Sequence, residues 1–356
     1  GFGSMMIGAS LFSSAGIAET YLHNAGIKMI AANELVPERA NLYKALYPES
    51  KMIIGDILHE EVFQNLIQSV PNQLDFLIAS PPCQGMSVAG KNRNIQEMAN
   101  DKRNHLIFRV IEFILLKRPT FILIENVPFF LKIKLPYKGT LQTVEAILQD
   151  LFGCEYYIQT HIFDSADYGV AQHRKRAIIR MNKHSTIWGM PEKVTKTISV
   201  RDAISFLPSI ESGQKSNVKW HFARTHAPEH IIWLKNTPTG RSAFDNIEHY
   251  PKKKNGEKIK SYNTTYRRME WDAPAPTITI RNDAISSQLN VHPGRPMPDG
   301  TYSDARVLTP LELMLLTSLP IDWNIPDDTS ELLIRQCIGE SIPPLLIKKI
   351  VERIGK

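Results

Sequence analysis

The first half of the chain alternates short apolar runs with segments in which apolar residues recur at helical spacing. The apolar runs predict strands at Met6–Phe12, Met29–Asn33, Met52–Ile54, Leu74–Ala79 and Phe121–Glu125. The helical spacing predicts helices at Ile17–Ala25, Pro37–Leu46, Glu60–Ser69 and Asn104–Lys117. Strands and helices that alternate with short connections form a mostly parallel sheet with helices on both faces. We therefore expect an α/β fold with a doubly wound sheet, in which ligands bind at the carboxyl ends of the strands.

The pattern changes after two further predicted strands, Tyr156–Phe163 and Ala177–Met181. From about residue 182 to residue 306 the chain is rich in Pro, Gly, Thr, His and Lys with weak periodicity, which predicts a second, smaller, loop-rich domain. Helical spacing returns at Pro310–Thr317, and a last helix at Pro344–Ile354 is expected to pack back on the first domain. The predicted domains are residues 5–182 with 330–356, and residues 183–329. Residues 1–4, ahead of Met5, are expected to be a remnant of cloning.

The composition favours a folded protein in a reducing compartment. Of the 356 residues 43% are apolar and 22% are charged, which is enough for a sizeable core. The longest apolar runs are too short to cross a bilayer, and no signal peptide opens the chain. The three cysteines, Cys83, Cys154 and Cys337, have neither a disulfide nor a zinc spacing. We therefore expect no metal, no membrane partner and a cytoplasmic location.

The charge is a mild indication of a polyanionic partner. The net charge is +6, the pI is about 9.0, and residues 181–300 carry 18 Lys and Arg against 11 Asp and Glu. The densest stretch, residues 252–268, contains the basic residues Lys252, Lys253, Lys254, Lys258, Lys260, Arg267 and Arg268 against Glu257 alone. A solvated basic loop explains this stretch as well as a nucleic-acid contact does.

Candidate ligand-binding residues follow the first three predicted strands. A turn of small residues, Ser13–Gly16, follows the first strand and would let the backbone approach a ligand closely. Glu34 and Asp56 close the second and third strands, where a carboxylate can accept hydrogen bonds from ribose hydroxyls. From these residues alone, the turn could also be a plain helix N-terminus.

Candidate catalytic residues follow the next strands. Cys83 stands in a Ser-Pro-Pro-Cys-Gln-Gly segment whose prolines fix its path, and a thiolate there would be a strong nucleophile. Glu125 stands at the end of the fifth strand, where an acid suits attack on a ring whose nitrogen must be protonated. The basic turn 172–176 could bind carbonyl oxygens or phosphates. A buried structural cysteine and an ordinary basic turn remain the alternatives.

In their order along the chain these residues resemble the motifs of the DNA (cytosine-5)-methyltransferase family. The resemblance covers nearly the whole chain and rests on nine segments: Leu11-Phe12 with Gly16, Asn33-Glu34, Asp56-Ile57, Pro81-Pro82-Cys83-Gln84, Asp101 with Arg103 and Leu106, Glu125-Asn126-Val127, Gln172 to Arg176 after Asp167-Tyr168-Gly169, Arg306 to Pro310 with Glu312 and Leu319-Pro320, and Gln336 to Pro344. Nine motifs in order leave little room for chance. Two positions depart from the family. Ser14 replaces the first glycine of a Phe-x-Gly-x-Gly pattern, and Glu340 stands where Asn usually follows the glycine of the last motif.

The resemblance implies a Rossmann-like methyltransferase that uses S-adenosyl-L-methionine, releases S-adenosyl-L-homocysteine, and methylates carbon 5 of a cytosine flipped out of double-stranded DNA. It implies that Cys83 adds to carbon 6, that Glu125 protonates ring nitrogen 3, and that Arg176 holds the exocyclic oxygen with Arg174 in support. Residues 5–182 with 330–356 would form the catalytic domain and residues 183–329 the target-recognition domain. The implied cofactor contacts are Phe12, Ser13, Ser14, Ala15, Gly16, Ile17, Glu34, Leu35, Asp56, Ile57, Pro81, Leu106, Glu340 and Ser341.

The same resemblance assigns the DNA contacts and the biological setting. The implied DNA-binding residues are Gln84, Ser87, Lys91, Arg93, Lys252, Lys253, Lys254, Arg267, Arg268 and Thr277. Residues 85–100 have the composition of a loop that could close on the flipped base. A short recognition domain resembles bacterial restriction–modification enzymes. On that analogy we expect a monomer near the nucleoid, with a cognate restriction endonuclease acting on the same site.

Three other functions fit the sequence less well. A tRNA cytosine-5 methyltransferase of the same superfamily would carry a Cys-Phe-Thr signature in its recognition region, but no cysteine lies between Cys154 and Cys337. A non-enzymatic DNA-binding homologue is disfavoured because Cys83, Glu125 and Arg176 are all present. A nucleotide-dependent oxidoreductase is disfavoured by the missing second glycine of the turn and by the Pro-Pro-Cys segment.

Overall fold

The structure is a computed structural model, and it describes residues 5–82, 105–260, 264–287 and 289–356. The chain divides into two compact units. The first comprises the residues up to Asp164, Lys175–Glu192 and Ile347–Lys356. The second comprises Ser165–Arg174 and Lys193–Leu346.

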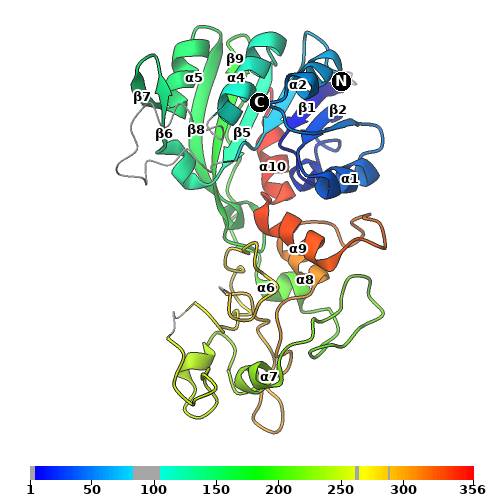
Figure 1. Ribbon diagram of the computed structural model, residues 1–356, viewed down its shortest axis with the longest axis vertical. Coiled ribbons are helices and arrows are strands. Elements are labelled where there is room, and N and C mark those ends of the chain that lie inside the picture. Colours follow the sequence, from blue (N-terminus) through cyan, green and yellow to red (C-terminus); the bar gives the residue numbers. More distant parts are fainter. Residues whose placement is uncertain (1–4, 83–104, 261–263, 288) are drawn as a thin grey trace. The chain divides into compact units, whose positions relative to one another are not determined.

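A seven-stranded sheet forms the centre of the first unit (Figure 1). The strands are β1 (Met6–Leu11), β2 (Ile27–Glu34), β3 (Lys51–Ile54), β4 (Phe76–Ala79), β5 (Phe121–Asn126), β8 (Tyr156–Asp164) and β9 (Lys175–Lys183). Their order is β3-β2-β1-β4-β5-β9-β8, parallel from β3 to β5 and antiparallel at β9. All seven predicted strands and the mostly parallel α/β fold are confirmed. The order reverses between β1 and β4, which is where ligands bind in sheets of this type.

Helices pack on this sheet. They are α1 (Pro37–Leu46), α2 (Glu60–Gln68), α4 (His105–Lys117), α5 (Val144–Phe152) and the second half of α10 (Pro344–Val351). The predictions for α1, α2 and α4 are confirmed to within a residue among the described positions. The sequence did not predict α5 or the hairpin of β6 (Lys134–Tyr137) and β7 (Thr140–Thr143) before it. Thr143 begins α5 by accepting a hydrogen bond from the backbone N–H of Ala146 at 3.2 Å.

The predicted helix at Ile17–Ala25 is wrong as a regular α-helix. Only Ile17–Glu19 is helical, as a 3-10 turn, and hydrogen-bonded turns follow it as far as Gly26. The cause lies in i to i+3 bonds, in which the N–H of Glu19 binds the carbonyl of Gly16 and the N–H of Leu22 binds that of Glu19. These tighter turns carry the Glu19 side chain to Ser10 of β1, 2.7 Å away.

The core of the first unit explains the long apolar runs. Every residue of β4 is buried, and so are the first five of β5, because helices cover both faces of a parallel sheet. The C-terminal segment also belongs to this unit. Trp188 donates from Nε1 to the carbonyl of Ile350 at 2.9 Å. The prediction that the last helix returns to the first domain is thus confirmed for residues 347–356.

The second unit consists largely of loops that connect short helices (Figure 1). Its helices are α6 (Val200–Ile204), α7 (Pro228–Lys235), α8 (Pro310–Leu316) and α9 (Glu331–Glu340). The predicted helix at Pro310–Thr317 is confirmed as α8. A capping box begins it, since Thr309 and Glu312 each bind the other's backbone N–H. One small core cluster contains Leu234, Ala243, Phe244, Tyr266, Ile285, Val291, Ala305 and Val307.

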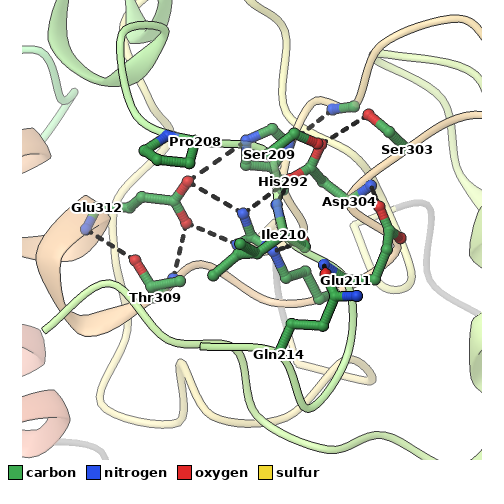
Figure 2. A network of polar contacts seen from close by, with 12 residues as sticks. Pro208, Ser209, Ile210, Glu211, Gln214, His292, Ser303, Asp304, Thr309 and Glu312 are labelled. Atoms are coloured by element: carbon green, nitrogen blue, oxygen red, sulfur yellow. Dashed lines mark hydrogen bonds and ion pairs between the residues drawn. The ribbon is translucent and has the colours of Figure 1, made fainter. Parts of the chain in front are cut away.

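A buried ionic network supplements this small core. The guanidinium of Arg306 donates to Glu312 at 2.7 Å, to Asp304 at 2.9 Å and to the carbonyl of Ile210 at 2.7 Å. None of the three side chains is more than 1% exposed. Figure 2 shows Asp304 and Glu312 with His292, whose Nε2 lies 3.4 Å from Glu312. In this unit of loops, fully paired buried charges hold segments together alongside the apolar contacts.

The compact units and the predicted domains divide the chain differently. Residues 165–174 and 330–346 fall in the second unit. The first of these segments is held there by Gln172 and Arg174, which bind the carbonyls of Leu316 and Ile278. The domain boundaries predicted from the sequence divide the chain by function. The division into compact units does not test them, so they stay a prediction. In the described part of the chain, no helix has the length and apolar character to cross a membrane.

Candidate functional site

The turn after β1 has an unusual backbone. Phe12, Ser14 and Gly16 all have positive φ, at 56°, 50° and 76°. The carbonyl of Asn33 accepts from the N–H of Ser13 at 3.2 Å, which ties the turn to the end of β2. Ser14 therefore adopts the left-handed conformation at the position where the family pattern has glycine, at a cost of about 1–2 kcal/mol. Its backbone N–H is satisfied by Glu34 Oε1 at 2.8 Å.

Glu34 lies at the end of β2 with 8% of its surface exposed. Oε1 accepts from Ser14 and Oε2 accepts from the backbone N–H of Val36, both at 2.8 Å. A carboxylate oxygen has two lone pairs, so each oxygen keeps capacity for one more donor. This arrangement fits a ligand with two neighbouring hydroxyls, such as a ribose. Leu35 is 60% exposed beside it.

The segment after β3 is held by an arginine that sequence reasoning missed. Asp56 is half-buried, and its Oδ1 accepts from the N–H of Leu58 at 2.9 Å. Arg109 of α4 donates from Nε to the carbonyl of Ile57 at 2.8 Å and from Nη2 to Glu60 at 3.1 Å. In the sequence, Arg109 and Glu112 are the only charged residues in the apolar helical pattern of residues 106–116, and a charge there was the available indication. The Ile57 side chain packs in the core, which leaves its backbone for the implied cofactor contact.

A hydrogen bond connects the end of β5 to the segment that follows β4. The side-chain amide of Asn126 donates to the carbonyl of Pro81 at 2.5 Å, and its Oδ1 accepts from the N–H of Val127 at 2.9 Å. Pro81 is buried, and Leu106 at the start of α4 is half-buried. Five predicted site residues, Cys83, Gln84, Ser87, Lys91 and Arg93, lie outside the described residues.

Glu125 and Arg176 form a buried pair at this edge. The two residues come from β5 and β9, whose antiparallel register places Glu125 opposite Ile178. Arg176 Nε lies 3.9 Å from Glu125 Oε2, and the side chains are 11% and 9% exposed. Burial lowers the pKa of Arg176, and the charge of Glu125 opposes that shift. A buried acid beside a buried base at a sheet edge is the arrangement expected of a functional site.

Arg174 has a different environment, in the second unit. It is 2% exposed, and its guanidinium donates to the carbonyls of Ile278 at 2.5 Å and Gly339 at 2.6 Å. These bonds tie three segments of the unit together, and the supporting role implied for Arg174 stays a prediction. Glu340 and Ser341, which end α9, also lie in the second unit, and the hydroxyl of Ser341 donates to the carbonyl of Cys337 at 2.5 Å.

The predicted DNA-binding residues of the second unit fall into two groups. Lys252, Lys253 and Lys254 are exposed, as is Thr277. Arg267 is half-buried and donates to the carbonyl of Gly240 at 2.8 Å. The exposure of these residues does not test whether they contact DNA, so the implied DNA contacts stay predictions.

Arg268 requires a correction. It is 1% exposed, and its guanidinium donates to the backbone carbonyls of Leu234, His292, Asp304 and Tyr302. Burial lowers its pKa to about 10, so it stays charged at neutral pH. A side chain enclosed in this way holds loops together and does not reach a phosphate. Its place in a dense basic stretch gave no indication of this.

The sheet, the reversal of strand order and the carboxylates after β2 and β3 define a nucleotide-type binding edge of the kind found in α/β methyltransferases. A family model described as C-5 cytosine-specific DNA methylase matches residues 6–356. The chain is 60% identical over 350 residues to Type II methyltransferase M1.HgaI of Avibacterium volantium, covering 98% of each chain. It is 27% identical over 350 residues to Type II methyltransferase M1.HphI of Haemophilus parahaemolyticus, covering 97% of this chain and 86% of that one.

Solved structures give the same fold at lower identity. The Entamoeba histolytica methyltransferase EhMeth matches with a TM-score of 0.65 at 15% identity, over 99% of this chain and 98% of the other. The chain belongs to the C-5 cytosine-specific DNA methylase family. It is therefore a DNA (cytosine-5)-methyltransferase that uses S-adenosylmethionine, and the predictions of family, fold and enzyme class are confirmed.

Proposed function

We propose that the chain is the modification enzyme of a Type II restriction–modification system. In this proposal it methylates a flipped-out cytosine through a covalent adduct of Cys83. The observation that carries the proposal is the buried Glu125–Arg176 pair at the end of β5, with Asn126 bound to Pro81, two residues before Cys83. The names of the relatives M1.HgaI and M1.HphI support the restriction–modification setting.

The residues around the turn after β1 fit S-adenosylmethionine. The carboxylate of Glu34 has capacity for the two ribose hydroxyls, and the backbone at Ser13–Gly16 carries no bulky side chain that would keep a methionine moiety away. Asp56 and the backbone of Ile57 would hold the adenine. When bound, the cofactor supplies an electrophilic methyl group on a positively charged sulfur.

The chain's own residues activate the base. Carbon 5 of cytosine is a weak nucleophile until the thiolate of Cys83 forms a bond to carbon 6. The ring electrons then move toward nitrogen 3, where Glu125 donates a proton, and carbon 5 gains enamine character. Arg176, held beside Glu125, binds the exocyclic oxygen. After methylation, a base removes the carbon-5 proton, and the electron pair of that bond expels the thiolate.

The test combines a map of methylated cytosines with a covalent trap. Bisulfite sequencing of DNA from cells that express the chain should reveal one methylated sequence context. A duplex with 5-fluorocytosine at that position should then form an adduct that survives denaturing electrophoresis, because fluorine cannot leave as a cation. Cys83→Ser should lose both methylation and the adduct while it still binds DNA. Methylation without any trapped adduct would contradict the mechanism. Methylation of tRNA transcripts and not of DNA would contradict the substrate.

The partner and the setting belong to the same proposal. We propose that the enzyme acts as a monomer in a bacterial cytoplasm, at the nucleoid. It would protect the site of a cognate restriction endonuclease. Sedimentation of the enzyme alone should give a mass near 40.4 kDa. DNA methylated by the enzyme should resist the endonuclease encoded beside it.

A further inference from the structure

A buried carboxylate lies behind the turn after β1, and the proposed mechanism does not use it. Glu19 is 3% exposed. Its Oε2 accepts from the hydroxyl of Ser10 in β1 at 2.7 Å, and its Oε1 accepts from the hydroxyl of Tyr43 in α1 at 2.6 Å. The group is thus fixed between a strand and a helix, three residues after the turn ends. Burying a carboxyl costs free energy that hydrogen bonds offset only in part. A carboxyl at this place therefore indicates a role that an apolar residue could not fill.

Tyr43 of α1 and Tyr47, which directly follows α1, enclose the last residue of the turn. The hydroxyl of Tyr47 donates to the carbonyl of Gly16 at 2.5 Å. The rings of Tyr43 and Tyr47 lie 4.6 Å apart by their centroids. A Cβ placed on Gly16 would come within 2.4 Å of the Tyr47 ring and 2.7 Å of the Tyr43 ring. Gly16 is therefore in contact with both rings, and Glu19 anchors one of them by its hydroxyl.

The turn itself needs support. Phe12 and Ser14 hold left-handed backbone conformations without being glycine, and such residues persist only where their surroundings impose them. On one side Ser14 is bound by Glu34, the carboxylate proposed for the ribose. On the other side Gly16 is bound by Tyr47. Displacement of the tyrosines would therefore release the turn and, through Ser14, change the setting of Glu34.

We propose that Glu19, with Ser10, Tyr43 and Tyr47, is a positioning cluster that holds the turn Ser13–Gly16 in the conformation that binds S-adenosylmethionine. Glu19 itself touches no cofactor atom. The cluster offsets the strain of a non-glycine residue in the left-handed conformation, which is why Ser14 is tolerated at a glycine position of the family pattern. This inference rests on the proposed cofactor site at Glu34. Burial raises the pKa of Glu19 to about 7, so the carboxyl is largely uncharged in mildly acidic buffer and can donate as well as accept within the cluster.

The experiment measures S-adenosylmethionine binding by calorimetry and steady-state kinetics on the full-length enzyme. Tyr47→Phe removes only the hydroxyl that holds Gly16 and should raise the Kd about tenfold, the effect of one lost hydrogen bond. Its matched control is Tyr156→Phe, which removes a buried hydroxyl bonded to the carbonyl of Pro119 at 2.6 Å, on the β8 edge of the same sheet. The control should lose comparable stability and keep the wild-type Kd.

A second pair of variants tests Glu19. Glu19→Ala should raise the Kd by about tenfold or more, and Glu19→Gln, which can still bind both hydroxyls, should restore it to within about twofold. In both weak-binding variants the KM for S-adenosylmethionine should rise by more than kcat falls. Wild-type Kd values for Tyr47→Phe and Glu19→Ala would overturn the inference and leave the proposed function intact. If Glu34→Ala also kept the wild-type Kd, the proposed cofactor site itself would fail.

Discussion

Arg176 Nε lies 3.9 Å from Glu125 Oε2, and both side chains are close to nine-tenths buried at the point where β5 and β9 run antiparallel. The two residues are 51 positions apart in sequence and meet because β9 enters the sheet against the direction of its neighbours. An antiparallel strand at this place brings the start of β9 to the carboxyl end of β5. The reversed direction of β9 thus places the guanidinium of Arg176 beside the carboxylate of Glu125.

The first prediction concerns this pair. Glu125→Gln keeps the shape of the side chain but replaces the acidic carboxyl by an amide that cannot donate its proton to the base. It should slow formation of the 5-fluorocytosine adduct by about 10²–10⁴-fold. The control is Glu155→Gln, which breaks the exposed ion pair of Glu155 with Arg118 in the same unit. It should form the adduct at the wild-type rate and lose at most about 1 kcal/mol of stability. Equal adduct rates in all three proteins would remove Glu125 from the mechanism.

The second prediction concerns stability and pH at Glu19. Burial raises the pKa of this group from 4.5 to about 7 in the folded protein, while the unfolded chain keeps the lower value. Below pH 4.5 both states hold the proton. Between pH 4.5 and 7 only the folded state holds it, so the free energy of unfolding falls as the pH rises, by about 3 kcal/mol at most. Above pH 7 the fall ends.

Glu19→Gln isolates this contribution because glutamine does not titrate. Urea unfolding of the wild type and of Glu19→Gln at several pH values should give a difference in stability that shifts in favour of the variant from pH 5 to pH 8. A difference that stays constant over this range would mean that Glu19 is ionised throughout in the folded protein. Other titrating groups cancel in the comparison.

The strand ends were predictable from the sequence, and most of their supports were not. Glu34, Asp56 and Glu125 each stand within two residues of the end of an apolar run, so the pattern of strands located them. Glu19 and Arg109 lie within helical segments, and what they bind depends on how α1 and α4 pack on the sheet. A sequence pattern records that such a residue is polar. It does not record which hydroxyl or carbonyl the fold brings to it.

The same limit explains the error at Arg268. Arg267 and Arg268 are neighbours in one basic stretch, yet the first is half-exposed and the second is buried against four backbone carbonyls. In a unit built of loops, backbone carbonyls without strand partners need donors, and a buried guanidinium supplies five N–H groups. Irregular loops give no periodicity from which this burial could be deduced.

The third prediction concerns the network of Figure 2. Arg306→Ala leaves Asp304 and Glu312 buried without their cation and should destabilise the second unit by about 3–5 kcal/mol. DNA binding should fall much more than S-adenosylmethionine binding, because the proposed ribose contact and its turn lie in the first unit, and only the implied contacts Glu340 and Ser341 lie in the second. Asp272→Ala breaks an exposed ion pair with Arg201 in the second unit and serves as the control. Parallel loss of both ligands in Arg306→Ala would show that the two units do not fold independently.

The last prediction separates the two kinds of basic residue in the stretch from Lys252 to Arg268. Lys252, Lys253 and Lys254 are exposed, and if they meet phosphates, each contributes to the release of counterions from DNA. Replacing all three by glutamine should make the plot of log affinity against log salt less steep by about 3, because each phosphate contact adds about 0.9 to the slope. Replacing Lys28, Lys44 and Lys51, which are exposed on the first unit, removes the same charge and should leave the slope nearly unchanged. Arg268→Gln, which removes the charge, should lower stability by breaking the bonds to backbone carbonyls, and it should not alter the slope, since a buried side chain displaces no counterion. Filter binding or anisotropy between about 50 and 200 mM salt measures all four proteins. An unchanged slope in the triple lysine variant would make residues 252–254 a solvated loop, and a change of about 1 in Arg268→Gln would restore that arginine as a DNA contact.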